Sequence, residues 1–408
     1  MMLRPVEEQQ AIGLAAVAPL EPIDLPLLEA HGCVLAADVE ALWPLPSFDN
    51  TSMDGYAVLA ADVAGASEAT PVQLRVVDDV PAGYRATERV SPGTAIRIMT
   101  GAPLPDGADA IVPVEGTDGG TDIVTIARSA EPGVFIRRAG EDVHAGEQVL
   151  RAGQYLSARE IAILAAAGHG SAVVHPRPRV VVISTGNELV EPGTPLKHGL
   201  IADSNSYMLV TAAKQAGAAA YRAGPVIDDE DLFMRTLDDQ LVRADLLVTS
   251  GGVSMGAYDT VKVVLSRLGT VEFTKVAMQP GMPQGFGTLG EENVPIVTLP
   301  GNPVSSYVSF EVFVRPLIRR MMGFANITRP QVRASVLEGW ASPANKTQFA
   351  RVDLSVAEGR YVIRPTGAQG SHILGGLSRA NALAVVPPEI TEVNAGDVLN
   401  VLDLGREG

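Results

Sequence analysis

The chain has 408 residues, of which 46% are hydrophobic, so it is long enough to bury several cores and to form more than one domain. Its 47 acidic and 31 basic residues give a net charge of −16, and a surface of this charge repels DNA, RNA and anionic lipid. We therefore expect neither nucleic acid nor a membrane as a partner.

The single cysteine, Cys33, excludes an internal disulfide bond and a cysteine-rich zinc site. Residues 1–14 carry acidic side chains where a signal peptide would be basic. No apolar run approaches the ~20 residues that a membrane helix needs. These features predict a cytoplasmic protein in a reducing compartment.

The first half of the chain predicts two helices around a β-rich segment. A helix is expected over Val6–Val17, and short β-like runs between Pro-Gly and Gly-Gly turns fill 26–139. A second helix is expected within 155–168, with Ser157 and Glu160 as a capping box. This helix could return to pack against the N-terminal one.

Beyond residue 179 the pattern changes to apolar strands that alternate with helices, which predicts a parallel sheet covered on both faces. The last segment alternates again with Gly and Pro breaks, which predicts a small β-barrel. The fold class is therefore α/β with additional all-β modules. The expected parts are a helical connecting domain, a β-rich domain, an α/β domain and a barrel, over 1–25 with 140–177, 26–139, 178–327 and 328–408.

Polar and glycine-rich segments follow three predicted strands, and ligands of parallel sheets bind beyond the carboxyl ends of the strands. Hydroxyl groups and free backbone N–H groups at such an edge suit phosphate binding. The loop after Ser250 is neither a Walker loop nor a GxGxxG fingerprint. The candidate binding residues are Thr185, Gly186, Ser250, Gly251, Gly252, Lys262, Pro300, Pro303 and Ser305.

Three carboxylates in the same region are candidate ligands for a divalent cation. Glu188 could hold the cation or cap a short helix. Asp228 is expected as the N-cap of the next helix, and a functional role is equally open. Asp259 follows the glycine-rich loop, where a carboxylate beside a phosphate site commonly carries Mg²⁺.

Three more polar motifs lie in the β-rich segment or just after it, each with a plain structural interpretation. Asp54 precedes Gly55 and could form a hairpin turn, and Thr100 before Gly101 could bind phosphate or form a tight turn. Asp142 lies in a run of mixed charge that would ordinarily be a solvated turn.

Six motifs together resemble the bacterial molybdopterin molybdotransferases, and they are similar to the E domain of gephyrin. In chain order they are PSFDNTSMDGYAV, IMTGAPLPDGADAIVPVE, RRAGED, STGNEL, TSGGVSMGAYD and LPGNPVSS. The resemblance covers nearly the whole chain. It implies four domains and an elongated homodimer.

The resemblance also implies a reaction, in which adenylylated molybdopterin and molybdate react with Mg²⁺ present, molybdenum is placed on the dithiolene and AMP is released. Molybdopterin adenylyltransferase and molybdoenzymes are the implied pathway partners. The implied catalytic residues are Asp54, Thr100, Asp142, Glu188, Asp228, Asp259 and Lys275. The implied molybdate positions are the 279–283 loop, Ser305, Arg351 and Ser371.

One motif departs from the family. Many members have the loop KPGKP, and here Gln279 and Met282 replace its two lysines. Three alternatives therefore stay open: a molybdopterin adenylyltransferase, whose single domain resembles 179–326, a scaffold, and a paralogue that binds molybdopterin or molybdate without full activity. The additional β modules argue against the first, and no linker or appended domain supports the second.

Overall fold

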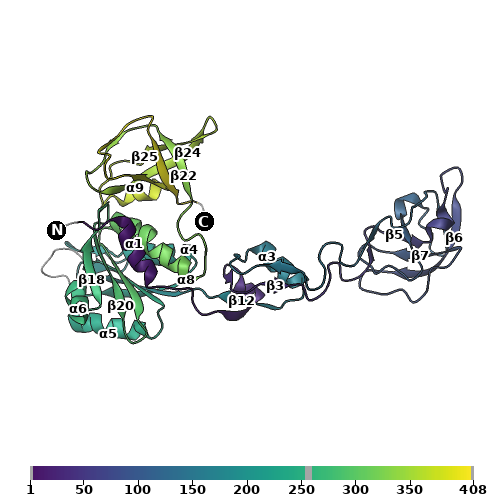
Figure 1. The fold of residues 1–408 in the computed structure, drawn as a ribbon, viewed down its shortest axis with the longest axis horizontal. Coiled ribbons are helices and arrows are strands. Elements are labelled where there is room, and N and C mark those ends of the chain that lie inside the picture. The colour runs from purple at the N-terminus through teal and green to yellow at the C-terminus, as the bar shows by residue number, and fades with distance from the viewer. Residues whose placement is uncertain (1–2, 253–259, 406–408) are drawn as a thin grey trace.

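A computed structural model of the chain describes residues 3–252 and 260–405. The molecule is elongated, with the α/β domain and the barrel together at one end and the β-rich module at the other (Figure 1). A small connecting module lies between them. Among the described residues, no helix has the length and apolar character to cross a membrane. The predicted multidomain α/β fold is confirmed.

The sheet of the α/β domain is mixed, where the sequence predicted a parallel one. Its first four strands are parallel, β20 is antiparallel to β21, and β18 is antiparallel to β20. The cause is the short connection from Leu289 to Val294, because a connection of this length permits only an antiparallel hairpin. The strand order is β16 (Ala219–Val226), β13 (Arg179–Thr185), β17 (Leu246–Ser250), β21 (Val294–Leu299), β20 (Pro283–Leu289) and β18 (Val271–Lys275).

Helices cover both faces of this sheet, because alternate residues of its central strands point to opposite sides. Val180 and Val182 of β13 pack into one core with α4 (Asn205–Gln215) and α8 (Arg315–Met321). Val181 packs into the other core with α5 (Glu230–Leu241) and α6 (Thr260–Leu268). The nearly continuous apolar character of β13 follows from this burial on two sides.

The N-terminal helix α1 (Val6–Ala15) packs on the α/β domain, against α8 and η3 (Phe310–Val314). The expectation that it packs with α3 (Ala158–Ala166) is wrong, because α3 contacts α2 (Leu27–Ala30) inside the connecting module. The predicted capping box of α3 is confirmed by the Ser157 backbone N–H, which donates to the Glu160 carboxylate at 3.0 Å.

The connecting module is built where the chain passes out to the β-rich module and returns. Its strands are β1 (Ile23–Pro26), β12 (Ser171–His175), β2 (Val34–Leu35), β3 (Val39–Glu40) and β11 (Gln148–Leu150). The outgoing strands pair with the returning ones, β1 and β2 with β12 and β3 with β11. Residues 26–40 therefore belong here, and the predicted start of the β-rich domain at residue 26 is too early. The pairing of segments more than a hundred residues apart could not be predicted from local sequence pattern.

The β-rich module at the far end has a five-stranded sheet around its own core. The strand order is β8 (Ala110–Pro113), β5 (Gly55–Val58), β7 (Thr94–Ile98), β6 (Val72–Val80) and β9 (Ile123–Ile126). Tyr56 and Val58 pack on one side of β5, and Ala57 packs on the other. A short pair joins β4 (Asn50–Thr51) to β10 (Ile136–Arg137), beside the connecting module.

The C-terminal segment forms the predicted barrel. The strands β24 (Thr347–Ala357), β25 (Arg360–Pro365), β22 (Gln331–Val336), β28 (Val398–Asp403) and β26 (Ala382–Val386) pair in this order, and β26 pairs again with β24 to close it. The short strand β19 (Met278–Gln279) of the α/β domain adds to β24 and so joins the two domains.

Candidate functional site

The carboxyl ends of four parallel strands meet at one edge of the α/β sheet. Ser184 is in register with Ser250, and Thr185 with Val226. Ser250 is in turn in register with Leu299, which precedes Pro300. The structure therefore brings together the segments around Thr185, Ser250 and Pro300, which the sequence had placed at one edge.

Glycines allow the loops at this edge to approach one another closely. Gly251 has φ +100°, and a Cβ atom on it would lie 2.7 Å from the carbonyl oxygen of Thr185. A Cβ atom on Gly252, with φ +67°, would lie 2.7 Å from Val261. Only glycine satisfies both the left-handed backbone and the short distances. The two glycines therefore let the loops after β13 and β17 meet at the edge that carries the hydroxyl groups of Thr185 and Ser250.

The carboxylate of Asp228 lies next to the loop that carries Glu188. The backbone N–H of Asn187 donates to Asp228 Oδ2 at 3.3 Å, and Asn187 Oδ1 accepts from the Asp228 backbone N–H at 3.0 Å. The predicted N-cap is wrong by one residue, since Asp229 caps α5 by accepting from Leu232 at 2.7 Å. Asp228 is therefore not used for capping. Asp259 lies outside the described residues.

Buried polar groups fix the base of this edge. Asn205 Nδ2 donates to Ser250 Oγ at 2.9 Å and to the Gly301 carbonyl at 2.7 Å. Asp203, 1% exposed, accepts from the hydroxyl groups of Ser184 at 2.5 Å and Ser206 at 2.6 Å. Sequence reasoning missed Asn205 and Asp203. The run Asp-Ser-Asn at a helix start was their only signal.

Thr185 and Asn205 also carry polar atoms that the described protein groups leave unsatisfied. Thr185 Oγ1 and Asn205 Oδ1 are buried and have no hydrogen-bond partner among the described residues. A buried polar group without a partner is costly, so such atoms mark places where a ligand or water would supply the missing bond.

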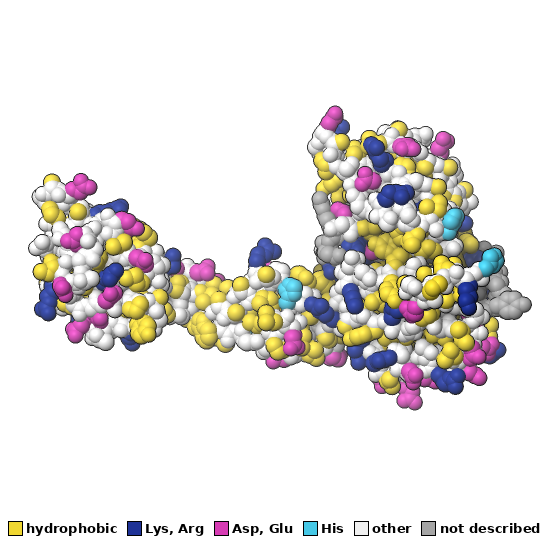
Figure 2. Space-filling model, turned by 180° about the vertical axis from the view of Figure 1, so that it is seen from behind, with side chains coloured by type: hydrophobic (Ala, Val, Ile, Leu, Met, Phe, Trp, Pro, Cys, Tyr) yellow, Lys and Arg dark blue, Asp and Glu magenta, His cyan; other side chains and the backbone are white. Residues whose placement is uncertain are grey.

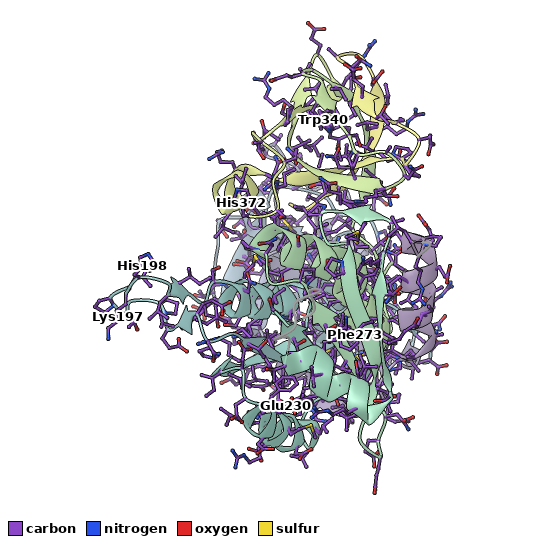
Figure 3. All side chains as sticks on the ribbon, turned by 90° about the vertical axis from the view of Figure 1, so that its left-hand side faces the viewer. Lys197, His198, Glu230, Phe273, Trp340 and His372 are labelled. Atoms are coloured by element: carbon purple, nitrogen blue, oxygen red, sulfur yellow. The ribbon has the colours of Figure 1, made fainter. Side chains whose placement is uncertain are left out.

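Helix α7 (Pro303–Ser309) begins at the same edge, below a loop of the barrel. Asn302 Nδ2 donates to Ser371 Oγ at 3.0 Å, and the Val304 N–H donates to the Ser371 carbonyl at 3.1 Å. The first turn of α7 was expected to be open to an anion, but Ser371 already takes one of its donors. His372, beside Ser371, lies at the junction of the barrel and the α/β domain in Figure 3.

Arg351 is buried inside the barrel wall, at 1% exposure. Its guanidinium donates to the carbonyl oxygens of Ile373 at 2.8 Å and Ala368 at 2.7 Å, and burial lowers its pKa. These donors shape the loop that carries Ser371. In this structure the guanidinium therefore supports the loop, in contrast to the direct oxyanion contact that the resemblance implied.

The 279–283 loop lies where the sheet, α7 and the barrel meet. Gly281, with φ +98°, is held by Gln284, whose Nε2 donates to the Gly281 carbonyl at 2.5 Å and to Ser309 Oγ at 2.6 Å. The carbonyl of Met282 accepts from the Val276 N–H at 2.8 Å. Lys275 ends β18 in register with Pro283, which places its backbone at this loop.

Asp54 and Thr100 of the β-rich module lie together, but far from the sheet edge of the same chain. The Thr100 backbone N–H and hydroxyl donate to Asp54 Oδ1 at 2.6 and 2.7 Å, and they hold the pKa of Asp54 below its ordinary value. Asp142 is exposed near β4 and β10, with its backbone N–H bonded to the Leu45 carbonyl at 3.0 Å. Asp54 and Thr100 lie in the module at the opposite end of the molecule (Figure 1).

This arrangement defines a multidomain α/β protein whose ligand site lies at the carboxyl edge of its central sheet. Family models match three segments that together cover most of the chain. Residues 4–168 match the MoeA N-terminal region (domain I and II), residues 181–320 the "probable molybdopterin binding domain", and residues 333–404 the MoeA C-terminal region (domain IV).

Named relatives extend over the full length of the chain. It is 49% identical to molybdopterin molybdenumtransferase 2 of Mycobacterium tuberculosis over 408 residues, covering 98% of this chain and 100% of the relative. Molybdopterin molybdenumtransferase 1 of the same organism is 40% identical, with 100% of both chains covered. A crystal structure of the molybdopterin biosynthesis MoeA protein of Pyrococcus horikoshii matches with a TM-score of 0.80 at 29% identity, and all of both chains is covered. The chain therefore belongs to the MoeA family, as its motifs predicted.

Proposed function

We propose that this chain is a molybdopterin molybdenumtransferase, which takes adenylylated molybdopterin and molybdate, places molybdenum on the dithiolene and releases AMP. The observation that carries the proposal is the sheet edge itself. The glycine loops after Thr185 and Ser250 carry buried polar atoms that have no partner among the described residues, and they lie beside the Asp228 carboxylate. This donor set suits a phosphorylated ligand.

The same edge fits a divalent cation. Mg²⁺ is usually held by one or two carboxylates together with the phosphates of a substrate. Glu188 and Asp228 follow neighbouring strands and are available for this role, because neither forms an ion pair within the described part of the chain. A substrate phosphate would complete the coordination, and Asp259, the third candidate ligand, lies outside the described residues. Bound Mg²⁺ would neutralise charge on the phosphoanhydride.

The protein's own groups would position the reactants. The Thr185 hydroxyl, which has no partner among the described residues, would bind a phosphate oxygen, whereas the N–H groups of Gly186 and Gly251 already donate to the carbonyls of Val226 and Leu299. Lys262 would supply positive charge from the first turn of α6. Molybdate would approach from the junction with the barrel, where Ser371 and the 279–283 loop lie. Breaking a phosphoanhydride needs positioning and charge neutralisation more than a covalent nucleophile.

A homodimer with a shared site is part of this proposal. One chain leaves Asp54 and Thr100 distant from its own sheet edge, so a second copy would supply them. The connecting module has the surface for such an assembly, since Leu28 is 87% exposed and Leu42 is 61% exposed. Apolar side chains are visible along this module in Figure 2. Exposed apolar groups gathered on one module favour a protein partner.

The pathway setting remains a set of predictions. A molybdopterin adenylyltransferase would deliver the adenylylated substrate, and molybdoenzymes would receive the product. A cytoplasmic location, which the lone cysteine suits, completes the proposal.

The direct test measures AMP release from adenylylated molybdopterin by the purified protein, with and without molybdate and Mg²⁺. We expect release that requires both. AMP release without molybdate dependence, or formation of the adenylylated substrate from ATP, would favour an adenylyltransferase. Tight binding of the pterin without turnover under any condition would favour a binding paralogue. The replacement of the family lysines by Gln279 and Met282 is the reason to test this alternative.

A further inference from the structure

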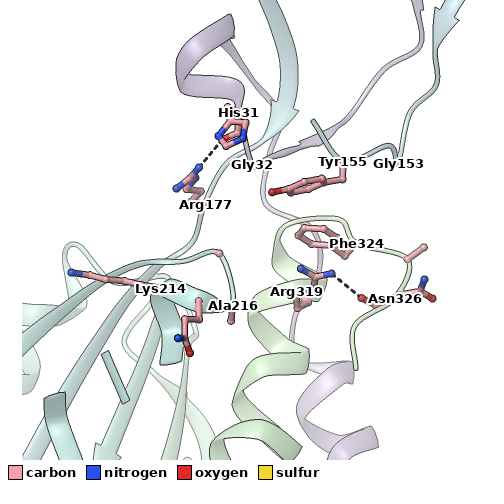
Figure 4. Close-up of a pocket in the computed structure, with 13 residues that line it drawn as sticks. His31, Gly32, Gly153, Tyr155, Arg177, Lys214, Ala216, Arg319, Phe324 and Asn326 are labelled. Atoms are coloured by element: carbon pink, nitrogen blue, oxygen red, sulfur yellow. Dashed lines mark hydrogen bonds between the residues drawn. The ribbon is translucent and has the colours of Figure 1, made fainter. Parts of the chain in front are cut away.

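A second pocket lies at the hinge between the connecting module and the α/β domain, at the opposite edge of the sheet from the proposed active site. It has a volume of about 520 Å³. One wall comes from the connecting module at Gly32 and Tyr155, and the other from the segments 214–217 and 319–326 (Figure 4). The segment 214–217 connects the end of α4 at Gln215 to the start of β16 at Ala219. It therefore lies at the edge of the sheet where the parallel strands begin.

The lining of this hinge pocket is basic. Arg177, Lys214 and Arg319 contribute cations and His31 adds an imidazole, whereas no Asp or Glu is among the described residues that line it. The chain as a whole carries a net charge of −16, so the positive charge of this lining is opposite in sign to the net charge of the protein. Cations gathered in a concave site raise the local concentration of anions.

Two of these cations are held in place by protein contacts. Arg319 is only 4% exposed, and its guanidinium carbon lies 3.4 Å from the ring centre of Phe324. The Phe324 ring in turn lies 5.7 Å from that of Tyr155, which belongs to the other wall. Arg177 donates to the His31 carbonyl at 2.6 Å, and Gly32 leaves room for it, since a Cβ there would lie 2.6 Å from Arg177 Nη2.

The third cation, Lys214, lines the pocket from the last turn of α4 and is exposed. Its ammonium group forms no hydrogen bond or ion pair with the described residues, and Figure 4 shows the side chain extending away from Arg319. An ammonium group and a guanidinium from the two walls of one pocket can bind a multivalent oxyanion together once the flexible lysine side chain turns toward it, and charge-assisted hydrogen bonds are the strong ones. Their mutual repulsion would fall when the anion binds.

We propose that the hinge pocket binds a small phosphate compound with at least two negative charges, such as pyrophosphate or a nucleotide. The ligand would join Arg177 of the connecting module to Lys214 and Arg319 of the α/β domain, and so fix the angle between the two parts. This angle sets where the β-rich module lies, which makes the pocket a site that regulates the presentation of Asp54 and Thr100 to another chain. The regulatory role rests on the proposed shared active site, but the binding does not.

The test uses hydrogen–deuterium exchange of the full-length protein with pyrophosphate, AMP and inorganic phosphate as separate probes. We expect pyrophosphate to protect the segments 153–155, 214–217 and 319–326. In the double variant Arg177→Gln/Lys214→Gln, the affinity for pyrophosphate that this protection reports should fall about tenfold or more. The variant Arg333→Gln/Arg360→Gln, which removes two exposed barrel cations, is the matched charge control and should bind as the wild type does.

Comparison of the probes separates a nucleotide from a simple polyphosphate. Protection by AMP that exceeds that by pyrophosphate would identify a nucleotide site. No hinge protection by any probe at millimolar concentration, or equal protection in the Arg177→Gln/Lys214→Gln variant, would overturn the proposal. Protection confined to the segments 184–188 and 249–252 would assign all binding to the sheet edge. Hinge protection that depends on protein concentration alone would show that a second chain covers the pocket.

Discussion

Asp54 and Thr100 are joined by two hydrogen bonds to one carboxylate oxygen, from the Thr100 backbone N–H at 2.6 Å and from its hydroxyl at 2.7 Å. Forty-five residues separate them in the sequence, and neighbouring strands β5 and β7 bring them together. The sequence allowed each of these two motifs to be a separate turn, but in the structure their side chains form one hydrogen-bonded polar unit. The donors from Thr100 stabilise the ionised carboxylate and lower the pKa of Asp54.

Replacement of Thr100 by Val should raise the pKa of Asp54 part of the way toward its ordinary value. The backbone N–H is the larger cause of the lowered pKa and remains, whereas the hydroxyl is lost. A ¹³C titration of the aspartate carboxyl groups would measure the change. Thr70→Val is the control, because the Thr70 hydroxyl bonds only to Ser67 and Gly65 in the same module.

The same lowered pKa fixes the sign of a pH effect on stability. Ionised Asp54 favours the folded state at neutral pH, and this contribution is lost as the pH falls through the ordinary carboxyl range and then the folded-state pKa. The stability difference between the wild type and Thr100→Val should therefore shrink on acidification. A difference that is constant or grows at low pH would contradict the assignment.

The shared active site predicts complementation between two inactive variants. Asp54→Ala disables the β-rich module, and Asp228→Ala disables the sheet edge. If each site combines the two chains, a heterodimer retains one intact site and should recover about half of the activity. Purified, verified heterodimers without AMP release would show that both parts act within one chain.

Gly251 should not tolerate a side chain. A Cβ there would lie 2.7 Å from the Thr185 carbonyl oxygen at φ +100°, so Gly251→Ala should cost about 1–3 kcal/mol of stability and weaken pterin binding. Gly269→Ala is the matched control, because Gly269 has φ +73° with open space around its Cβ position. Urea unfolding of both variants separates the free energy lost to the steric clash from that lost to the left-handed backbone. Equal losses of unfolding free energy in the two variants would argue against close packing at the edge.

Arg351 should act mainly through the loop that it supports. Arg351→Met leaves the carbonyls of Ala368 and Ile373 without their donor, and we expect a loss of about 2–4 kcal/mol together with faster proteolysis of residues 366–376 in the absence of molybdate. An unchanged stability combined with a raised half-saturating molybdate concentration would instead indicate direct contact with the oxyanion.

Met282→Lys should improve the use of molybdate. A lysine at this position restores a cation at the junction of the sheet and the barrel, and a charge-assisted contact is worth about 1.5–3 kcal/mol when desolvated. We expect the half-saturating molybdate concentration for AMP release to fall by about tenfold or more. Val356→Lys, at an exposed barrel position, controls for added charge. If Met282→Lys leaves that concentration unchanged, position 282 does not touch the oxyanion.

The sequence by itself determined the alternation of strands and helices in the α/β domain, the barrel, the capping box of α3 and the family. Each of these depends on local pattern or on motifs that lie close together in the chain. Thr185, Ser250 and Pro300 could be placed at one edge because parallel strands end on the same side of a sheet.

Only the tertiary structure decided which distant segments touch. It placed α1 on α8, paired residues 23–40 with 148–175, and turned the guanidinium of Arg351 toward backbone carbonyls. These outcomes depend on contacts across more than a hundred residues, or on which of several acceptors surrounds a buried cation. The energies of such contacts come from packing and desolvation, and neither leaves a periodic signal in the sequence.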